Sequence, residues 1–342
     1  MNKAVLTTGA EIRAAAEKIV KKAEEAGGLR RVYCVACGGS KASMYPIDYL
    51  LSQESSALSV QSVSANEFYH ATPKGVGPDA LVIGLSLGGG TAETVNACKK
   101  ARELGAATLS LTIRLGTPLS DACEYNFIFD DETQDYQEEA RTHFEATNQL
   151  ILLRLGFELL RLCDGYAHYD AAVEGCEKLP EICRKAAAKA ARRAVAYGEA
   201  RKDDPVMYTI GSGPSMFTAY MQCICMFMEM EWIHSSSIHA GEFFHGPFEI
   251  TDRDVPFTIF MNEGRTRALD ERALSFLRQY ADMDKVTVID VKEYGINAID
   301  DSVEEYFSAV IAWAVAFEYA LGLAAAKKHP IFQRRYMGKV KY

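Results

Sequence analysis

The sequence lacks an excess of positive charge. Its 342 residues include 37 lysines and arginines against 46 aspartates and glutamates, so the formal net charge is −9 at pH 7. A protein with this charge is not drawn to nucleic acid through sequence-independent phosphate contacts. We therefore expect no nucleic-acid partner.

A targeting segment and a membrane span are also missing. The N-terminus, MNKAVLTTG, has too short an apolar run for a signal peptide, and Glu11 and Arg13 follow soon after it. The long apolar stretch at residues 307–326 is interrupted by a serine, a glutamate and a glycine. This pattern predicts a buried helix and no association with a membrane.

The nine cysteines show no regular spacing, and their number is odd. Such usage in a chain of this length is typical of reduced thiols, so we expect a cytoplasmic protein without disulfides. Cys34 and Cys37 have the C-x-x-C spacing but lie in an apolar run, and no second pair completes a zinc site. Core cysteines are the favoured interpretation, with no metal and no cofactor.

Fingerprints of nucleotide binding are absent, because no G-x-G-x-x-G turn or P-loop follows a predicted strand. Two other turns suit a phosphate: CGGSK at 37–41 and SLGGGTAET at 86–94. In each, an apolar strand ends in glycines and hydroxyl residues before a helix, so free amides and hydroxyls can meet an anion. The alternative is that Ser40 and Thr91 only cap their helices.

Strand and helix patterns alternate through the first 130 residues. Short apolar runs separated by amphipathic segments predict a parallel sheet covered on both faces, the doubly wound α/β arrangement. The predicted strands are 32–36, 57–63, 80–86 and 107–112, and the predicted helices are 10–26, 41–51 and 91–104.

The pattern then restarts, because VMYTIGSGPS at 206–215 echoes VYCVACGGS at 32–40. We interpret this as an internal duplication of one α/β unit, whose ligands bind at the carboxyl ends of its strands. The later predicted elements are strands at 256–261 and 286–290 and helices at 138–162, 169–201, 265–280 and 303–327. The predicted organisation is a first domain at 1–135, connecting helices at 136–200, a second domain at 201–328 and a basic tail at 329–342.

An acid/base pair is indicated in the segment 227–249. Glu229 lies in an apolar run beside Met228, Met230 and Trp232, so we expect partial desolvation that makes it a better proton acceptor near neutral pH. His245 follows sixteen positions later, before a Gly-Pro turn that can fix its direction. The alternative is a solvated glutamate and an ordinary loop histidine.

The charge reverses at the end of the chain. Residues 327–342 carry six lysines and arginines and no carboxylate side chain. Either these charges belong to a solvated tail, or one or two of them fold back over an anionic ligand.

Together these features resemble the sugar isomerase (SIS) domain family. The resemblance rests on the strand ends Ala-Cys-Gly-x-Ser and Ser-x-x-Gly-x-Thr-x-Glu-Thr, on the duplicated unit, and on the glutamate sixteen positions before the histidine of Gly-Glu-x-x-His-Gly-Pro. It is similar to the isomerase half of glucosamine-6-phosphate synthase and more so to the fructosamine-6-phosphate deglycases. The fold that this implies is α/β, with two tandem SIS-type doubly wound domains whose parallel sheets are flanked by helices.

The resemblance also implies roles for matching residues. The family's general base falls on Glu229 and its ring-opening histidine on His245, which in the synthase comes from the neighbouring subunit and implies a homodimer with shared sites. Glu242, Arg335 and Lys339 are further candidates for substrate contact. The residues implied for the substrate phosphate are Gly39, Ser40, Ser86, Gly88 and Thr91.

One departure from the family concerns the second turn. The synthase pattern has hydroxyl and amide side chains where this chain has Leu87 and Gly88. Phosphate contacts at these two positions therefore fall to backbone amides.

The implied reaction is the hydrolysis of a 6-phosphorylated fructosamine to glucose 6-phosphate and an amino acid, without a metal or an organic cofactor. No glutaminase domain precedes the first predicted domain, which favours breakdown over synthesis. Two alternatives stay open: an aldose-ketose phosphosugar isomerase, and a non-catalytic phosphosugar-binding regulator. An acid/base pair disfavours the regulator, because binding alone does not require one.

Overall fold

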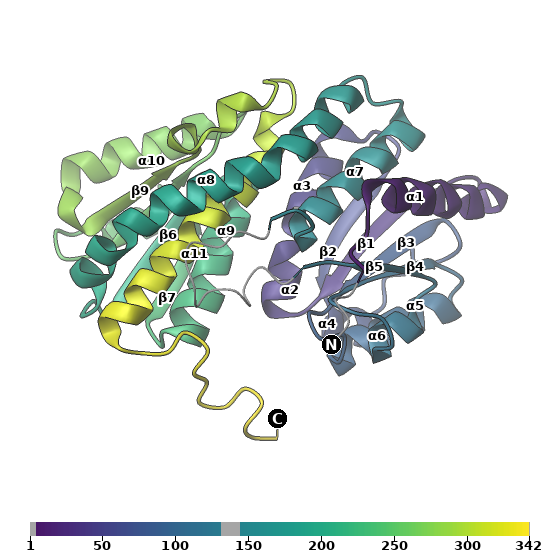
Figure 1. Cartoon of the computed structure of the whole chain (residues 1–342), viewed down its shortest axis with the longest axis horizontal. Coiled ribbons are helices and arrows are strands. Elements are labelled where there is room, and N and C mark those ends of the chain that lie inside the picture. The colour runs from purple at the N-terminus through teal and green to yellow at the C-terminus, as the bar shows by residue number, and fades with distance from the viewer. Residues whose placement is uncertain (1–4, 131–143, 342) are drawn as a thin grey trace. The chain divides into compact units, whose positions relative to one another are not determined.

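The computed structural model describes residues 5–130 and 144–341, and this part of the chain forms two compact units (Figure 1). The first unit contains residues 5–130 and 144–177, and the second contains residues 178–341. The division falls inside the long helix α8, Tyr169–Arg201. The beginning of the helix predicted at 138–162 lies outside the described residues, and the helix observed there is α7, Asn148–Asp164.

A parallel five-stranded sheet forms the centre of the first unit, in the order β2-β1-β3-β4-β5. The central strands β3 and β4 are buried along their whole length, as their apolar sequences require of strands covered on both faces. The strands are β1 Arg31–Ala36, β2 Ser59–Ser64, β3 Ala80–Leu85, β4 Ala107–Thr112 and β5 Tyr125–Ile128.

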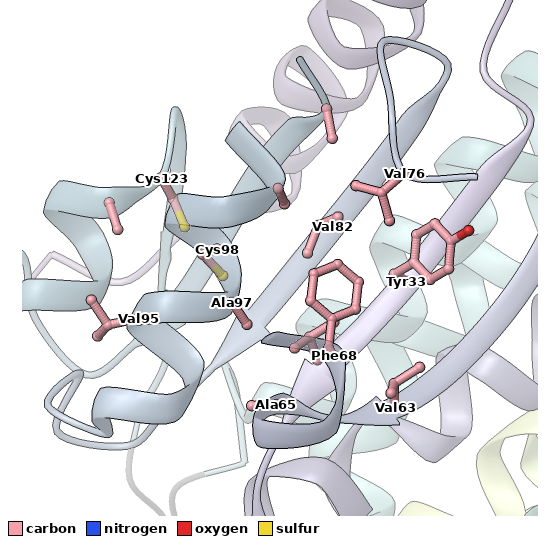
Figure 2. Packing of buried hydrophobic residues seen from close by; sticks show 14 of the residues in the cluster. Tyr33, Val63, Ala65, Phe68, Val76, Val82, Val95, Ala97, Cys98 and Cys123 are labelled. Carbon is pink, nitrogen blue, oxygen red and sulfur yellow. The ribbon is translucent and has the colours of Figure 1, made fainter. Parts of the chain in front are cut away.

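Helices cover both faces of this sheet. On one face, α4, α5 and α6 bury a cluster that includes Tyr33, Phe68, Val82 and Cys98 (Figure 2). On the other, α1 and α3 pack against α7. The helices are α1 Gly9–Ala23, α2 Gly38–Ser43, α3 Tyr45–Glu54, α4 Ala65–His70, α5 Ala92–Glu103, α6 Pro118–Ala122 and α7.

The second unit repeats this topology. Its parallel sheet has the order β7-β6-β8-β9, so its first strand again lies between its second and its third. This agrees with the predicted duplication. The edge strand β7 was not predicted, because its sequence, HSSSIH, is polar and only Ile238 is buried along it. The strands are β6 Val206–Gly211, β7 His234–His239, β8 Phe257–Met261 and β9 Val286–Asp290.

The apolar segment near the C-terminus is a core helix of the second unit. The stretch Glu304–Lys327 is long and apolar enough to cross a membrane by length and composition, but 78% of its most apolar window is buried. This agrees with the predicted buried helix. The helices of this unit are the rest of α8, α9 Met216–Met221, a π-helix Gln222–Met230, α10 Arg267–Tyr280 and α11 Ser308–Lys327.

All nine cysteines are free, and seven of them are buried. Cys34 lies inside β1 and Cys37 follows the strand, so both belong to the packing of the first unit. The prediction of core thiols is confirmed.

Candidate functional site

The predicted phosphate turns meet at one edge of the first sheet. Strand β1 leads to β2 on one side and lies beside β3 on the other, so the carboxyl ends of β1 and β3 form the switch point where ligands of doubly wound sheets bind. Ser40 lies in α2, directly after β1, and Ser86 directly follows β3. The topology thus brings both turns to the same place.

The two hydroxyls of the second turn contact each other. Ser86 Oγ lies 2.9 Å from Thr91 Oγ1, and Ser86 is 4% exposed. Thr91 is the N-cap residue of α5, yet its side chain accepts no hydrogen bond from that helix. Ser40 lies inside α2, whose N-cap residue is Cys37. Helix capping therefore does not account for either hydroxyl.

Glycines leave the backbone of this turn open. Among the described residues, no heavy atom other than those of the glycine and its two chain neighbours lies within 4 Å of the position that a Cβ would take at Gly88 or at Gly90. Gly89 is different, because its φ is +67° and a Cβ there would lie 2.2 Å from Thr117 Oγ1. The first amides of α5 have no partner inside the helix. The turn can therefore present amides and hydroxyls to an anion, and phosphate contact by the backbone amides at Leu87 and Gly88 stays a prediction.

Glu229 lies in the wall of a cavity of about 590 Å³ in the second unit. It stands near the end of the π-helix, a rare form that is frequent at functional sites. The cavity is lined by Met228, Glu229, Trp232, Ile233, His234, Ser235, Arg334, Arg335, Tyr336 and Met337.

The carboxylate of Glu229 forms an ion pair with Arg334. The guanidinium Nε and Nη2 both lie 2.8 Å from Glu229 Oε1, and the side chains are 15% exposed for Arg334 and 26% for Glu229. Glu229 is partly buried, as expected for a partly desolvated carboxylate, but Met228 beside it is 44% exposed and a cation faces the carboxylate.

The basic tail reaches the same cavity, since Arg334–Met337 form part of its wall. The guanidinium of Arg335 lies over the ring of Trp232 at 4.0 Å from the centroid. The ammonium group of Lys339 donates a hydrogen bond to the carbonyl of Arg334, and this contact within the tail restrains its conformation. Sequence reasoning did not single out Arg334, because nothing local links two residues 105 positions apart.

His245 and Glu242 lie at the other end of β7. Glu229 precedes the strand, and its cavity includes His234 at the strand's beginning. His245 follows the strand's end in a run of turns, where its amide donates to the carbonyl of Glu242 at 2.9 Å. A six-residue strand spans about 20 Å. One chain therefore does not bring Glu229 and His245 together.

Within the described residues, no group of three or more His, Cys, Asp or Glu side chains is arranged to hold a metal ion. A smaller cavity of about 220 Å³ in the first unit, lined by α1, α7 and the start of α8, contains none of the predicted site residues.

Known proteins resemble this chain along nearly its whole length. A model of the SIS domain matches residues 29–158. The fructosamine deglycase FrlB of Bacillus subtilis is 40% identical over 314 residues, which are 92% of this chain and 93% of that protein. The fructoselysine 6-phosphate deglycase of Escherichia coli is 27% identical over 96% of this chain and 89% of its own.

Solved structures share the fold. A candidate phosphosugar isomerase from Bacillus subtilis has a TM-score of 0.90 and 38% identity, with 97% of each chain covered. The C-terminal domain of glucosamine-fructose-6-phosphate aminotransferase from Francisella tularensis has a TM-score of 0.72 and 17% identity over 94% of each chain, which shows likeness of fold alone. The chain therefore belongs to the sugar isomerase (SIS) domain family, in the group that contains the fructosamine deglycases.

Proposed function

We propose that this protein hydrolyses a 6-phosphorylated fructosamine, the Amadori adduct of an amino acid, to glucose 6-phosphate and the free amino acid. The observation that carries the proposal is the carboxylate of Glu229 in the wall of a substrate-sized cavity. Its support is the 40% identity to a protein named fructosamine deglycase, over 92% of the chain. The nine free thiols favour a cytoplasmic setting.

The chemistry follows from one base and one proton carrier. His245 assists opening of the ketosamine ring, which exposes the C2 carbonyl. Glu229 removes a proton from C1, and the electron pair moves to the C2 carbonyl to give an enaminol. Reprotonation at C2 leaves an imine between C1 and the nitrogen. Water adds to C1, the amine leaves, and the aldehyde of glucose 6-phosphate remains.

The open turn at 86–94 in the first unit contributes most to substrate binding, through contacts with the phosphate. The Ser86 and Thr91 hydroxyls and the nearby amides suit the 6-phosphate, and Ser40 and Gly39 extend the same edge of the sheet. A phosphate bound here fixes the sugar for a reaction that requires no cofactor, because the substrate's own carbonyl and nitrogen carry the electrons.

A coupled assay tests the activity. Purified protein is incubated with a panel of 6-phosphorylated fructosamines, and glucose 6-phosphate and free amine are measured together. Equal amounts of both products support the proposal. Interconversion of a phosphorylated aldose and ketose without release of amine assigns an isomerase instead, and saturable binding without turnover assigns a regulator.

The separation of Glu229 from His245 along β7 supports a site shared between two copies of the chain. In such a homodimer, His245 of one subunit serves Glu229 of the other. Mixing inactive Glu229→Gln and His245→Ala proteins should then restore roughly a quarter of the wild-type activity, since about half of the dimers are mixed and each has one intact site. A mixture that stays inactive after subunit exchange contradicts the shared site.

A further inference from the structure

Glu231, two positions after the proposed base, is a buried carboxyl group without a partner. Its residue is 1% exposed, and neither of its carboxylate oxygens has a hydrogen-bond partner among the described residues. Its backbone, by contrast, is held on both sides. The amide donates to the carbonyl of Met226 at 2.9 Å, and its own carbonyl accepts from Lys327 Nζ at 2.9 Å. The backbone at Glu231 is thus held by hydrogen bonds, whereas its carboxyl group makes none with the described residues.

The next residue, Trp232, is held in an unusual backbone conformation. Its φ is +57°, a left-handed value that is uncommon and strained for a bulky residue. Its ring contacts the ring of His329, with centroids 4.3 Å apart, and carries the guanidinium of Arg335 on its face. The amide of Ile233 then donates to the carbonyl of Phe227 at 2.8 Å. This strained turn, residues 231–233, links Glu229 to β7 and forms part of the cavity wall.

Several elements place ionisable groups around the turn. The π-helix packs against β7, α9, α11 and β6. The groups are Cys223, Cys225 and Glu229 on the π-helix, His234 on β7, Tyr220 on α9, Lys327 at the end of α11, and His329, Arg334 and Arg335 in the tail. Arg334 forms an ion pair with Glu229, and the guanidinium of Arg335 lies over the ring of Trp232. Lys327 donates a hydrogen bond to the carbonyl of Glu231.

Burial decides the protonation of Glu231. It raises the pKa of this carboxyl group to about 7, while the nearby charge of Lys327 acts in the opposite direction. The neutral form therefore prevails in acidic solution, and the charged form appears as the pH rises through neutrality. An unpaired charge in this interior is costly, so ionisation favours states in which the side chain reaches water.

We propose that Glu231 is a positioning residue for Glu229: its neutral form keeps the turn 231–233 packed, and its ionised form leaves the interior and displaces Trp232 and Glu229. The consequence for turnover rests on the proposed function, whereas the movement of the turn does not. The enzyme therefore loses activity on the alkaline side through a group that never touches the substrate.

Two measurements test this inference. The kcat of the wild type is followed from about pH 5.5 to pH 9, and we expect it to fall above neutrality as a single proton is lost, by up to tenfold per pH unit. Glu231→Gln, which keeps the shape and cannot ionise, should match the wild type at acidic pH and keep its turnover on the alkaline side. Glu103→Gln, an exposed carboxylate at the end of α5, is the matched control and should follow the wild type.

The fluorescence of Trp232 gives a readout that needs no substrate. Trp313, the other tryptophan of the chain, is 3% exposed and lies in α11. We expect the emission of the wild type to change with a midpoint near pH 7 and that of Glu231→Gln to stay constant. A flat wild-type titration overturns the inference even if the variant does not fold. A fluorescence change without any effect on the pH profile of kcat removes the positioning role, and absence of deglycase activity at every pH refutes only the proposed function.

Discussion

The two units have the same switch point in their sheets but use it differently. We call the edge formed by Ser40, Ser86 and Thr91 the open switch point. The filled switch point is formed by Ser212 after β6, Asn262 after β8, and Asp270 in the first turns of α10. In the first, two hydroxyls face a glycine turn with free space above it. In the second, the carboxylate of Asp270 occupies the centre.

Asp270 satisfies the polar groups that surround it. Its Oδ1 accepts from Ser212 Oγ at 2.7 Å, and its Oδ2 accepts from the amide of Asn262 at 3.2 Å. Asn262 Nδ2 in turn donates to Oδ2 at 2.5 Å and to Thr266 Oγ1 at 3.1 Å. The protein thus places its own carboxyl group where the first unit has room for a ligand.

The fourth residues of α10 and α5 show how little the two switch points differ in sequence. Asp270 is the fourth residue of α10, and the fourth residue of α5 is Val95, which is 5% exposed and packs in the apolar cluster. Thr266 and Thr91 are the N-cap residues of the same two helices. The duplicated fold therefore forms the same edge in both units, while in the second unit one internal carboxyl group fills it.

Replacing Asp270 should give the largest effect, on stability. Burial raises the pKa of Asp270 to about 7, against its hydrogen bonds and the charge of Arg267. A carboxyl group whose pKa is raised by folding binds its proton in the native state between about pH 4 and 7, so it stabilises the fold at low pH and loses this contribution as the pH rises. A rise of about 3 in this pKa corresponds to a change in the free energy of unfolding on the order of 4 kcal/mol.

Asp270→Asn cannot ionise, so its free energy of unfolding should rise relative to wild type, by on the order of 3 to 4 kcal/mol, between about pH 4 and pH 7.5. Denaturant unfolding at several pH values measures this difference. If the free energy of unfolding of Asp270→Asn instead falls relative to wild type over the same pH range, the three hydrogen bonds of Asp270 outweigh its burial. Asp254→Asn, at an exposed position in the second unit, is the control and should give a flat difference.

The second prediction concerns the proposed base Glu229, which lies near the end of the π-helix and not at the filled switch point. Glu229→Gln keeps the shape but removes the base, so kcat should fall about 100-fold or more while substrate still binds. Glu242→Gln at the other end of β7 is the matched control. If the control loses turnover and Glu229→Gln keeps it, the base is Glu242.

A third prediction compares the two N-cap threonines. Thr91→Ala removes a charge-assisted hydrogen bond to phosphate worth about 1.5 to 3 kcal/mol, so KM for the phosphorylated substrate should rise about tenfold or more. Thr266→Ala at the filled switch point should leave KM unchanged, because Asp270 excludes a ligand there. Steady-state kinetics of both variants decide the point. Equal increases in KM would mean that the filled switch point also binds substrate.

The sequence predicted the parts of the fold that depend on local pattern. The strand β9 was expected at 286–290 and the helix α8 at 169–201, and both have these bounds, because periodicity and turn residues are local signals. Strand β7 was missed, since an edge strand can be polar. The two turns at 37–41 and 86–94 were located through their glycines, which the backbone itself requires, and their role in phosphate binding stays a prediction.

The rest of the site depends on distant residues. Nothing near Glu229 in the sequence indicates that Arg334 pairs with it, or that Lys327 holds the carbonyl of Glu231. Such contacts follow from the packing of α11 against the π-helix, which periodicity does not reveal. The filled switch point was also not foreseen, because the first strand and turn of the two units look alike and the difference lies in α10.

The smallest expected effect concerns the tail, which has no counterpart in the first unit. Deleting residues 337–342 removes Met337 from the cavity wall and removes Lys339, whose ammonium holds the carbonyl of Arg334. Arg334 then loses its fixed position beside Glu229, and kcat/KM should fall about tenfold. The melting temperature should stay the same, because Met337 and Val340 are each 51% exposed and contribute little to packing. Lys339→Met removes the hydrogen bond to the carbonyl of Arg334 but keeps Met337 in the cavity wall. This variant should show part of the decrease in kcat/KM. Unchanged kinetics in the truncated protein would show that the basic tail is only a solvated end of the chain.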